Sequence, residues 1–189
     1  TKPLATFLIS ILLIFLALPE KALAANTHSI DFERSSSQYD SITDAAQTGL
    51  DLASDFTIEA WVKVENAPST NQYYAIVGKG DFASNRAYVL NYRDNDSVKE
   101  LQLLVSTDGS TFTQHTYTQT LTPGTWYHVA ATYDISPARS QMYLNGTSLG
   151  TTSGGGTPFN SSGAFAVGSL GTPSQYFDGL IDDVRVWSD

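Results

Sequence analysis

Short runs in which apolar and polar residues alternate recur along most of the chain, and they constrain the fold more than any other feature. The clearest is the run from residue 56 to 63 (FTIEAWVK), whose apolar residues occupy every second position. A period of two is the signature of a half-buried β-strand. Turn signals separate the runs at intervals of roughly 8–12 residues, which is the spacing of an all-β sandwich or barrel.

The runs are rich in the β-branched and aromatic residues that favour strands. They cover residues 28–33, 38–43, 56–64, 73–79, 86–92, 101–106, 111–118, 126–133, 140–144, 164–167 and 177–187. Asn145-Gly146, between two such segments, is a strong hairpin signal. The one helix-like stretch, residues 43–52, contains Gly49 and lacks an apolar stripe. We therefore predict an all-β sandwich of two curved antiparallel sheets with roughly 12 strands in total.

The first 24 residues have the form of a secretory signal peptide. Lys2 precedes an apolar run over residues 4–18, and Ala22-Leu23-Ala24 supplies small residues at the positions that a signal peptidase reads. The run is shorter than the about 20 apolar residues of a membrane-spanning helix. We predict export with cleavage before Ala25, no membrane insertion after cleavage, and a secreted or cell-surface location. Residues 25–189 then form the domain.

Charge and cysteine content exclude several kinds of partner and site. Beyond residue 24 the chain has 8 basic and 18 acidic residues, a net charge of −10. Nucleic acids and anionic membranes bind basic surfaces, so neither is expected as a partner. The chain has no cysteine, which excludes disulfides, thiolate metal sites and cysteine nucleophiles.

Motifs that resemble catalytic signatures do not have the required context. Gly146-Thr147-Ser148-Leu149-Gly150 has the spelling of a nucleophile elbow, but the segment lies in a predicted hairpin rather than between a strand and a helix. The three histidines, His28, His115 and His128, have no partner at metal-binding helical spacing, and no phosphate-binding loop is present. We expect no nucleotide cofactor, and we interpret His128 as a core or half-buried residue.

Glycoside hydrolysis needs two carboxyl groups roughly 5–10 Å apart. Asp182 and Asp183 are adjacent, so on a strand they point to opposite faces. Asp31 and Glu33 share one face of the first strand but have no third carboxylate in their run. The sequence therefore predicts a segment that is not an enzyme.

Five segments in order carry a resemblance to a known family. They are DFTIEAWVK (55–63), IVGKG (76–80), WYHVAATYD (126–134), MYLNG (142–146) and FDGLIDDVRVW (177–187). Together they resemble the laminin-G-like, pentraxin-like jelly-roll domains of the concanavalin A-like lectin/glucanase superfamily. The resemblance covers roughly residues 28–187. Two departures are the absence of cysteines and an end at Asp189, before the short polar segment with which the family usually continues, so we expect the domain to be truncated there.

The resemblance implies a two-sheet jelly-roll binding module of an exported protein, usually non-catalytic, that holds carbohydrate or an extracellular protein ligand. We expect a role in adhesion or substrate targeting. Two alternatives stay open: an accessory domain of a secreted glycoside hydrolase or other enzyme whose catalytic part lies beyond residue 189, and a structural cell-surface spacer.

Tyrosines near loops and strand ends are the predicted ligand-binding residues, because exposed rings stack on the apolar faces of sugars. The predicted set is Tyr73, Tyr74, Tyr88, Tyr92, Arg93 and Tyr176. The alternative is that these rings pack in the core. We assign Trp61, Trp126 and Trp187 to the core, since they lie within the strand motifs.

The family often binds calcium at the sandwich rim, which makes calcium the expected metal. Asp31 on the first strand and Asp182 on the last are the leading ligands, because terminal strands of a sandwich often meet. Asp94 and Asp96, with D-x-D spacing in a polar loop, are the second choice. Calcium takes 6–8 oxygen ligands and accepts backbone carbonyls, so few acids are needed. The alternative is that Asp182 accepts backbone hydrogen bonds and the loop acids are only hydrated.

Overall fold

The computed structural model describes residues 28–188 except residues 82 and 171–174. The predicted signal peptide and its cleavage site lie outside the described residues. No helix in the part of the chain that the structure describes is long and apolar enough to cross a membrane.

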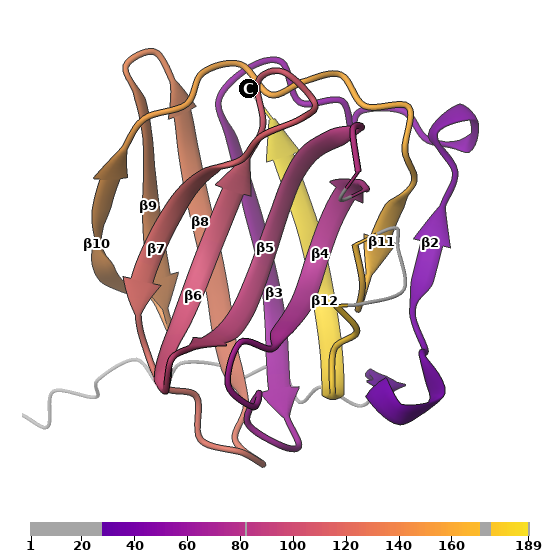
Figure 1. Cartoon of the computed structure of the whole chain (residues 1–189), viewed down its shortest axis with the longest axis vertical. Coiled ribbons are helices and arrows are strands. Elements are labelled where there is room, and N and C mark those ends of the chain that lie inside the picture. Colours follow the sequence, from indigo (N-terminus) through magenta and orange to yellow (C-terminus); the bar gives the residue numbers. More distant parts are fainter. Residues whose placement is uncertain (1–27, 82, 171–174, 189) are drawn as a thin grey trace, which may run out of the picture.

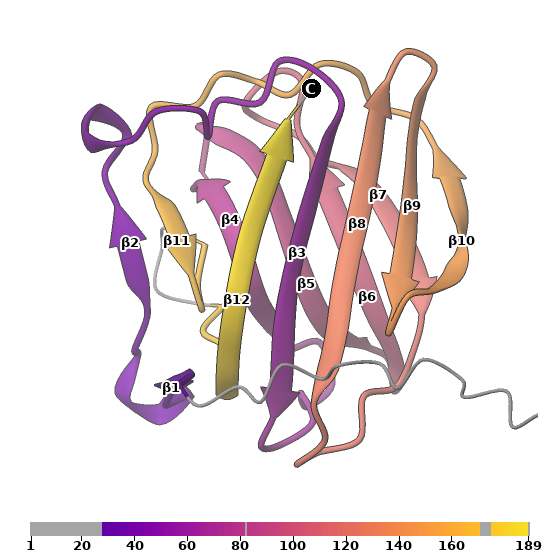
Figure 2. The ribbon, with the colours of Figure 1, turned by 180° about the vertical axis from the view of Figure 1, so that it is seen from behind.

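Twelve strands form two antiparallel six-stranded sheets packed face to face (Figure 1), as predicted. Sheet A has the order β1-β12-β3-β8-β9-β10, and sheet B has the order β2-β11-β4-β5-β6-β7. Figure 2 shows the molecule from behind, with sheet A toward the reader. The strands are β1 (Ile30–Phe32), β2 (Asp40–Ile42), β3 (Phe56–Val64), β4 (Tyr73–Gly80), β5 (Arg86–Asn95), β6 (Val98–Val105), β7 (Thr113–Thr118), β8 (Tyr127–Ile135), β9 (Ala138–Leu144), β10 (Thr147–Ser153), β11 (Phe165–Val167) and β12 (Gly179–Ser188).

The alternation seen in the sequence of β3 places its apolar face in the core, and every second residue from Phe56 to Val64 is buried. Asn145 and Gly146 both have positive φ and connect β9 to β10, in which Thr147 pairs with Leu144. The predicted hairpin is therefore confirmed. Two 3-10 turns, η1 (Arg34–Ser36) and η2 (Asp44–Ala46), are the helical elements of the described residues.

A buried lysine ties the segment around η2 to sheet B. The Lys79 side chain on β4 is fully buried, and its Nζ lies 2.5 Å from Asp44 Oδ1 and 3.1 Å from Asp51 Oδ1. It also donates to the Gly163 carbonyl at 3.3 Å. The hydrogen bond from Lys79 holds the pKa of Asp44 below its ordinary value. The stretch 43–52, which lacks an apolar stripe, is thus held in part by charge pairing.

The tryptophans do not belong to the core, contrary to the prediction. Trp61 and Trp126 are half-buried, and Trp187 is 57% exposed. Because Trp61 lies between the inward-facing Ala60 and Val62, its ring must leave on the outer face of sheet A. There the Trp61 ring packs 5.4 Å from that of His128, which is half-buried as predicted.

Candidate functional site

Three of the predicted ligand-binding tyrosines lie in the core, which corrects that part of the prediction. Tyr74, Tyr88 and Tyr92 are 2%, 0% and 0% exposed and belong to the hydrophobic cluster between the sheets. The Tyr88 hydroxyl donates to the Leu50 carbonyl at 2.8 Å, and the Tyr92 hydroxyl accepts from the Leu121 N–H at 3.1 Å. Burial raises the pKa of Tyr74 to about 12 and raises that of Tyr88 as well. None of these rings presents a free face to a sugar.

Tyr176 is also buried, at 8% exposure. Its ring packs 6.0 Å from that of Tyr39, and its carbonyl accepts from Arg34 Nη1 at 2.6 Å. The prediction that Tyr176 stacks on a ligand is therefore corrected to a packing role at the sandwich edge.

Tyr73 and Arg93, the other two predicted ligand residues, lie side by side on the outer face of sheet B. They are register partners on β4 and β5. Arg93 follows the inward-facing Tyr92, so its side chain leaves on the opposite face. The guanidinium lies 5.3 Å from the Tyr73 ring centroid, and Nη1 donates to the Tyr73 hydroxyl at 2.6 Å. The structure brings this pair together.

Cross-strand pairing extends Tyr73 and Arg93 into a row across sheet B. Glu100 on β6 pairs with Arg93, and Thr118 on β7 pairs with Glu100. Arg93 Nε donates to Glu100 Oε2 at 2.7 Å. Desolvation alone would lower the pKa of Arg93, but hydrogen bonds to Glu100 and Tyr73 outweigh it and raise that pKa. The first row therefore combines a ring, an ion pair and a hydroxyl.

A second row runs beside the first and consists of Ala75, Asn91, Gln102 and Thr116. Asn91 and Gln102 are fully buried, although they lie on the outer face, between residues that point into the core. Gln102 Nε2 donates to Thr116 Oγ1 at 2.7 Å. Among the described residues, Asn91 Nδ2, Asn91 Oδ1 and Gln102 Oε1 have no hydrogen-bond partner. Buried polar atoms are rarely left so, and each instance calls for an explanation such as local strain, a bound water or ion, or a functional role.

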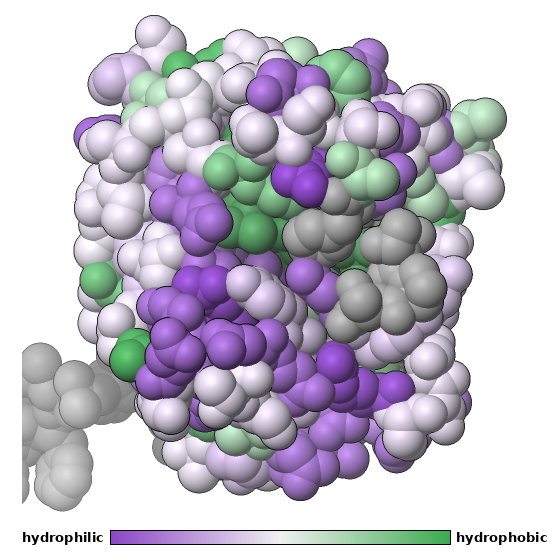
Figure 3. Space-filling view, viewed as in Figure 1, coloured by the Kyte–Doolittle hydropathy of each residue, from purple (hydrophilic) through white to green (hydrophobic). Residues whose placement is uncertain are grey.

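Beyond the second row the face is apolar on β4, β5 and β6. Gly78, Val89 and Leu104 follow in register. Leu170 packs on this part of sheet B, in a small cluster with Ala75, Val89 and Leu104. A Cβ at Gly78 would lie 2.6 Å from Leu170 Cδ1. Figure 3 shows this side of the molecule, with hydrophilic side chains gathered on its lower half, in front of β5 and β6.

The two rows, of four residues each, are called the polar rows of sheet B. They offer amide donors and acceptors, hydroxyls and an aromatic ring, the groups that bind sugar hydroxyls and sugar ring faces. The sequence-based set contains Tyr73 and Arg93 but not Glu100, Asn91 or Gln102, although Asn91 is a polar neighbour of the predicted Tyr92. The available signal was the presence of polar residues inside otherwise apolar runs, Leu90-Asn91-Tyr92 and Leu101-Gln102-Leu103.

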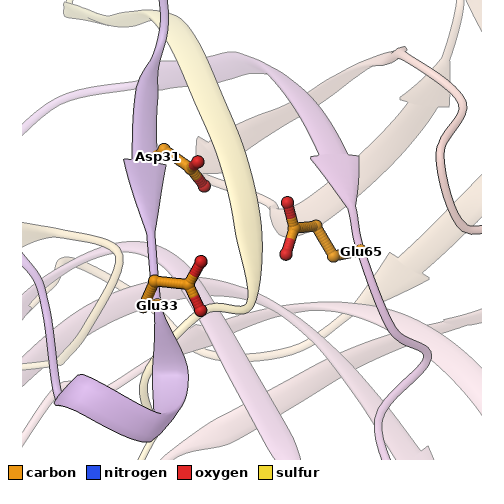
Figure 4. Close-up of side chains that lie close together, drawn as sticks. All are labelled: Asp31, Glu33 and Glu65. Carbon is orange, nitrogen blue, oxygen red and sulfur yellow. The ribbon is translucent and has the colours of Figure 1, made fainter.

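The predicted calcium ligands separate into different surroundings. β1 pairs with β12, so the terminal strands meet as expected, with Asp31 opposite Leu180. Asp31 groups with Glu33 and Glu65, and their carboxylate oxygens lie within 4.8 Å of one another (Figure 4). We call these three residues the acidic cluster. Asp182 is not a member: its Oδ1 accepts from the Asp183 N–H at 2.6 Å, and its Oδ2 is buried without a partner among the described residues.

The acidic cluster forms around the beginning of β12. Gly179 pairs with Phe32 of β1 on one side and with Val64 of β3 on the other. Glu65 follows Val64, and its N–H donates to the Asp178 carbonyl at 3.0 Å. Desolvation and the charges of Asp31, Glu33 and Asp178 raise the pKa of Glu65. The carboxylates are therefore crowded enough for a cation to relieve their repulsion.

Asp94 and Asp96, the second choice for calcium, do not form a free carboxylate pair. Asp94 is ion-paired with Lys99 and accepts from the Ser97 N–H at 2.7 Å. The hydrogen bond from Lys99 holds the pKa of Asp94 below its ordinary value. Asp96 is exposed, and its Oδ1 accepts from Asn71 Nδ2 at 3.5 Å. Because Lys99 already neutralises Asp94, this loop is a poor metal site, which corrects the second choice.

Comparison with known proteins identifies the family. The Laminin_G_3 family model, described as concanavalin A-like lectin/glucanases superfamily, matches residues 34–189. The chain belongs to this superfamily. The resemblance noted in the sequence is thereby confirmed. A search of the curated proteins gives no match.

Several solved structures resemble this sandwich over most of the chain. The CBM40 module of the Ruminococcus gnavus IT-sialidase, bound to α2,3-sialyllactose, has a TM-score of 0.65 at 15% identity, covering 86% of this chain and 90% of that one. Domain 4 of the GH43 extracellular arabinanase AbnA from Geobacillus stearothermophilus, in complex with arabinotriose, has a TM-score of 0.54 at 20% identity, covering 74% and 63%. The heptameric SAP-like pentraxin of Limulus polyphemus has a TM-score of 0.54 at 16% identity, covering 75% and 72%.

A Bacteroides ovatus protein also matches, with a TM-score of 0.58 at 22% identity over 79% of this chain. This chain spans 40% of that protein. At these identities the likenesses show the fold, and two of these neighbours, the CBM40 module and domain 4 of AbnA, were solved with a bound oligosaccharide.

Proposed function

We propose that this domain is a non-catalytic carbohydrate-binding module and that it binds saccharide at the polar rows of sheet B. The observation that carries the proposal is the set of unpartnered amide atoms on Asn91 and Gln102. Family membership and neighbours solved with arabinotriose and sialyllactose support the ligand class.

The rows supply complementary contacts to a sugar. The Tyr73 ring is half-buried, so part of it is available to an apolar sugar face. Thr116 and Thr118 offer hydroxyls at the β7 side, where exposure rises. Saccharide hydroxyls both donate and accept, so they can satisfy an amide oxygen and an amide nitrogen together. Asn91 and Gln102 are buried, so a saccharide that binds first at the partly exposed Tyr73, Thr116 and Thr118 reaches their amides only when the side chains that cover them move aside.

The absence of a carboxylate pair in the rows supports a binding role over hydrolysis. Glycosidases place two carboxyl groups on either side of the scissile bond. Glu100 is the one carboxylate of the eight residues, and Arg93 holds it by a hydrogen bond.

We also propose that the protein is exported and acts at or outside the cell surface, in adhesion or in targeting a larger protein to its substrate. Residues 2–24 support export through their signal-peptide pattern. An extracellular protein ligand is the alternative partner, and an accessory domain of a longer enzyme is the alternative role.

Replacing Asn91 by Val should weaken saccharide binding while leaving stability unchanged or higher. Removing an unsatisfied buried amide relieves its desolvation cost of about 1–3 kcal/mol. A glycan array should identify the ligand, and titration calorimetry should then show at least about a tenfold weaker affinity for the variant. If Asn91 served only in packing, its replacement would not weaken binding while stability stayed the same or rose.

Gln141→Val is the matched control, because Gln141 lies on β9 in sheet A and its amide donates to Ser148 Oγ at 2.9 Å. This control should keep wild-type affinity. An array on which no glycan binds saturably, or an Asn91→Val variant that binds as the wild type does, would contradict the proposed function.

We further propose that the acidic cluster binds calcium. Its donors are oxygens alone, as calcium prefers. None of its three carboxylates forms an ion pair among the described side chains. Asp31, Glu33 and Glu65 would hold the ion, which would neutralise their mutual repulsion at the start of β12.

Calcium at several millimolar should therefore raise the melting temperature by a few degrees relative to chelator. Extracellular modules bind with a dissociation constant of about 10⁻⁴–10⁻³ M. At ten times that constant the folded state gains about 1.4 kcal/mol. Glu65→Gln should remove this rise in melting temperature. Asp96→Asn, in the loop that is a poor metal site, should retain it. Superimposable melts with calcium and with chelator would refute this metal assignment.

A further inference from the structure

The charge of Arg93 is already compensated within the protein. Its Nε donates to Glu100 Oε2 at 2.7 Å, and the two side chains are only 12% and 10% exposed. Its Nη1 donates to the Tyr73 hydroxyl at 2.6 Å, with the guanidinium over the ring. This arginine is the one cation in the polar rows, so its pairing with Glu100 determines the net charge of the rows.

The other residues of the rows are neutral. The other six are Tyr73, Thr118, Ala75, Asn91, Gln102 and Thr116, none of which is an Asp, Glu, Lys, Arg or His. Because the charges of Arg93 and Glu100 cancel, the rows have zero net charge, whereas the whole chain has a net charge of −9. A negatively charged ligand would therefore meet no uncompensated cation in the rows and a repulsive field around them.

We propose that the Arg93–Glu100 pair makes this face select neutral saccharides over saccharides that carry carboxylates, with Glu100 as the residue that determines this specificity. The inference rests on the proposed function of the same face. A sugar carboxylate that approached the Arg93 guanidinium would have to compete with Glu100 for its N–H groups. It would also lie close to the Glu100 carboxylate in a poorly hydrated setting, where like charges repel strongly.

Glu100→Gln tests the role of that carboxylate with little change in shape. The glutamine oxygen can still accept from Arg93 Nε, but the positive charge of Arg93 is no longer opposed. The variant should therefore gain affinity for acidic saccharides specifically. In Arg93→Gln/Glu100→Gln, which lacks the cation as well, the gain should disappear.

The matched control is Glu59→Gln on β3. Glu59 is likewise largely buried and is ion-paired with Arg185 at 3.4 Å, with His128 Nε2 3.2 Å from its Oε2, but it lies on the outer face of sheet A. Both single variants change the net charge by the same amount. The control thus separates a local effect at Arg93 from a general reduction of repulsion.

The experiment measures affinity for two pairs of probes, lactose with 3′-sialyllactose and arabinotriose with trigalacturonate, at low ionic strength. Titration calorimetry gives the ratio of neutral to acidic affinity, and amide chemical shifts report whether the polar rows are contacted. We expect the wild type to favour the neutral probe of at least one pair by about tenfold or more. Glu100→Gln should reduce that ratio by a similar factor, and Glu59→Gln should leave it unchanged.

Equal wild-type affinity for the neutral and the acidic member of every pair that binds at the rows would overturn the selectivity. A ratio that is unchanged in Glu100→Gln, or changed equally in Glu59→Gln, would overturn the role of Glu100. These outcomes leave the proposed function standing, because saccharide still binds. If none of the four probes changed the amide chemical shifts of the polar rows in any variant, the proposed function would be refuted together with the inference.

Discussion

Replacing Tyr88 by Ala is expected to lower the free energy of unfolding by about 3–5 kcal/mol. The ring is fully buried between the sheets, 5.9 Å from that of Phe56. Its removal leaves a cavity and withdraws the donor from the Leu50 carbonyl, 2.8 Å away. A change of 1 kcal/mol moves the melting temperature by about 2–4 °C in a chain of this size. Thermal denaturation should therefore show a fall of about 6–20 °C.

Two variants separate the contributions at this position. Tyr88→Phe keeps the ring and should cost only about 1 kcal/mol for the lost hydrogen bond. Tyr143→Ala, at a half-buried position on β9, should have a small effect. If Tyr88→Ala kept its stability and lost saccharide binding, the sequence-based assignment of Tyr88 to the ligand site would be right and its assignment to the core wrong.

The sandwich was predictable because strand alternation is a local property. Residues 56–64 form a strand with the bounds expected, and Asn145-Gly146 forms the expected hairpin. Sheet order is a different matter, because pairings such as β12 with both β1 and β3 join residues far apart in the chain. The sequence supplied that order only through its family resemblance.

The sequence did not predict correctly which side chains point into the core in strands that are buried on both faces. In β5, residues 87–92 are all buried, so the sequence reads as nearly continuous apolar residues with little contrast between faces. The sequence pattern therefore favours Tyr88 and Tyr92 as ligand residues, although both point inward while Asn91 points outward. In β3 the contrast between faces is clear, yet its strand motif led to a core prediction for Trp61, although the alternation gives the inward positions to its neighbours Ala60 and Val62. Position in the alternation is the better guide.

The acidic cluster shows a second limit. The shared face of Asp31 and Glu33 could be read from their spacing, but Glu65 joins them only because β12 lies between β1 and β3. Asp182 was a reasonable partner for Asp31, since their strands do pair. Its Oδ1 is instead used by the adjacent Asp183 N–H, at a residue with φ of 51°. Ligand sets that depend on three strands are beyond what local spacing can predict.

The close approach of three strands at the start of β12 should make Gly179→Ala strongly destabilising. Gly179 has φ of +132°, which L side chains rarely adopt. An added Cβ would lie 2.2 Å from the Lys63 carbonyl oxygen and 2.9 Å from the Glu65 nitrogen. Both atoms are backbone, so β12 would have to move away from β3. We expect a loss of about 3–5 kcal/mol in the free energy of unfolding, measured by denaturant titration.

Gly124→Ala separates backbone strain from overlap. Gly124 has φ of +78°, but a Cβ there would have no atom within 4 Å. The free energy of unfolding of this variant should therefore fall by only about 1–2 kcal/mol, the cost of placing a non-glycine residue in the left-handed region. Because Asp31 and Glu65 are carried by the segments on either side of β12, a displaced β12 should also weaken the stabilisation by calcium in Gly179→Ala but not in Gly124→Ala. Equal losses of stability in the two variants would show that the strands do not approach as closely at Gly179 as the structure has them.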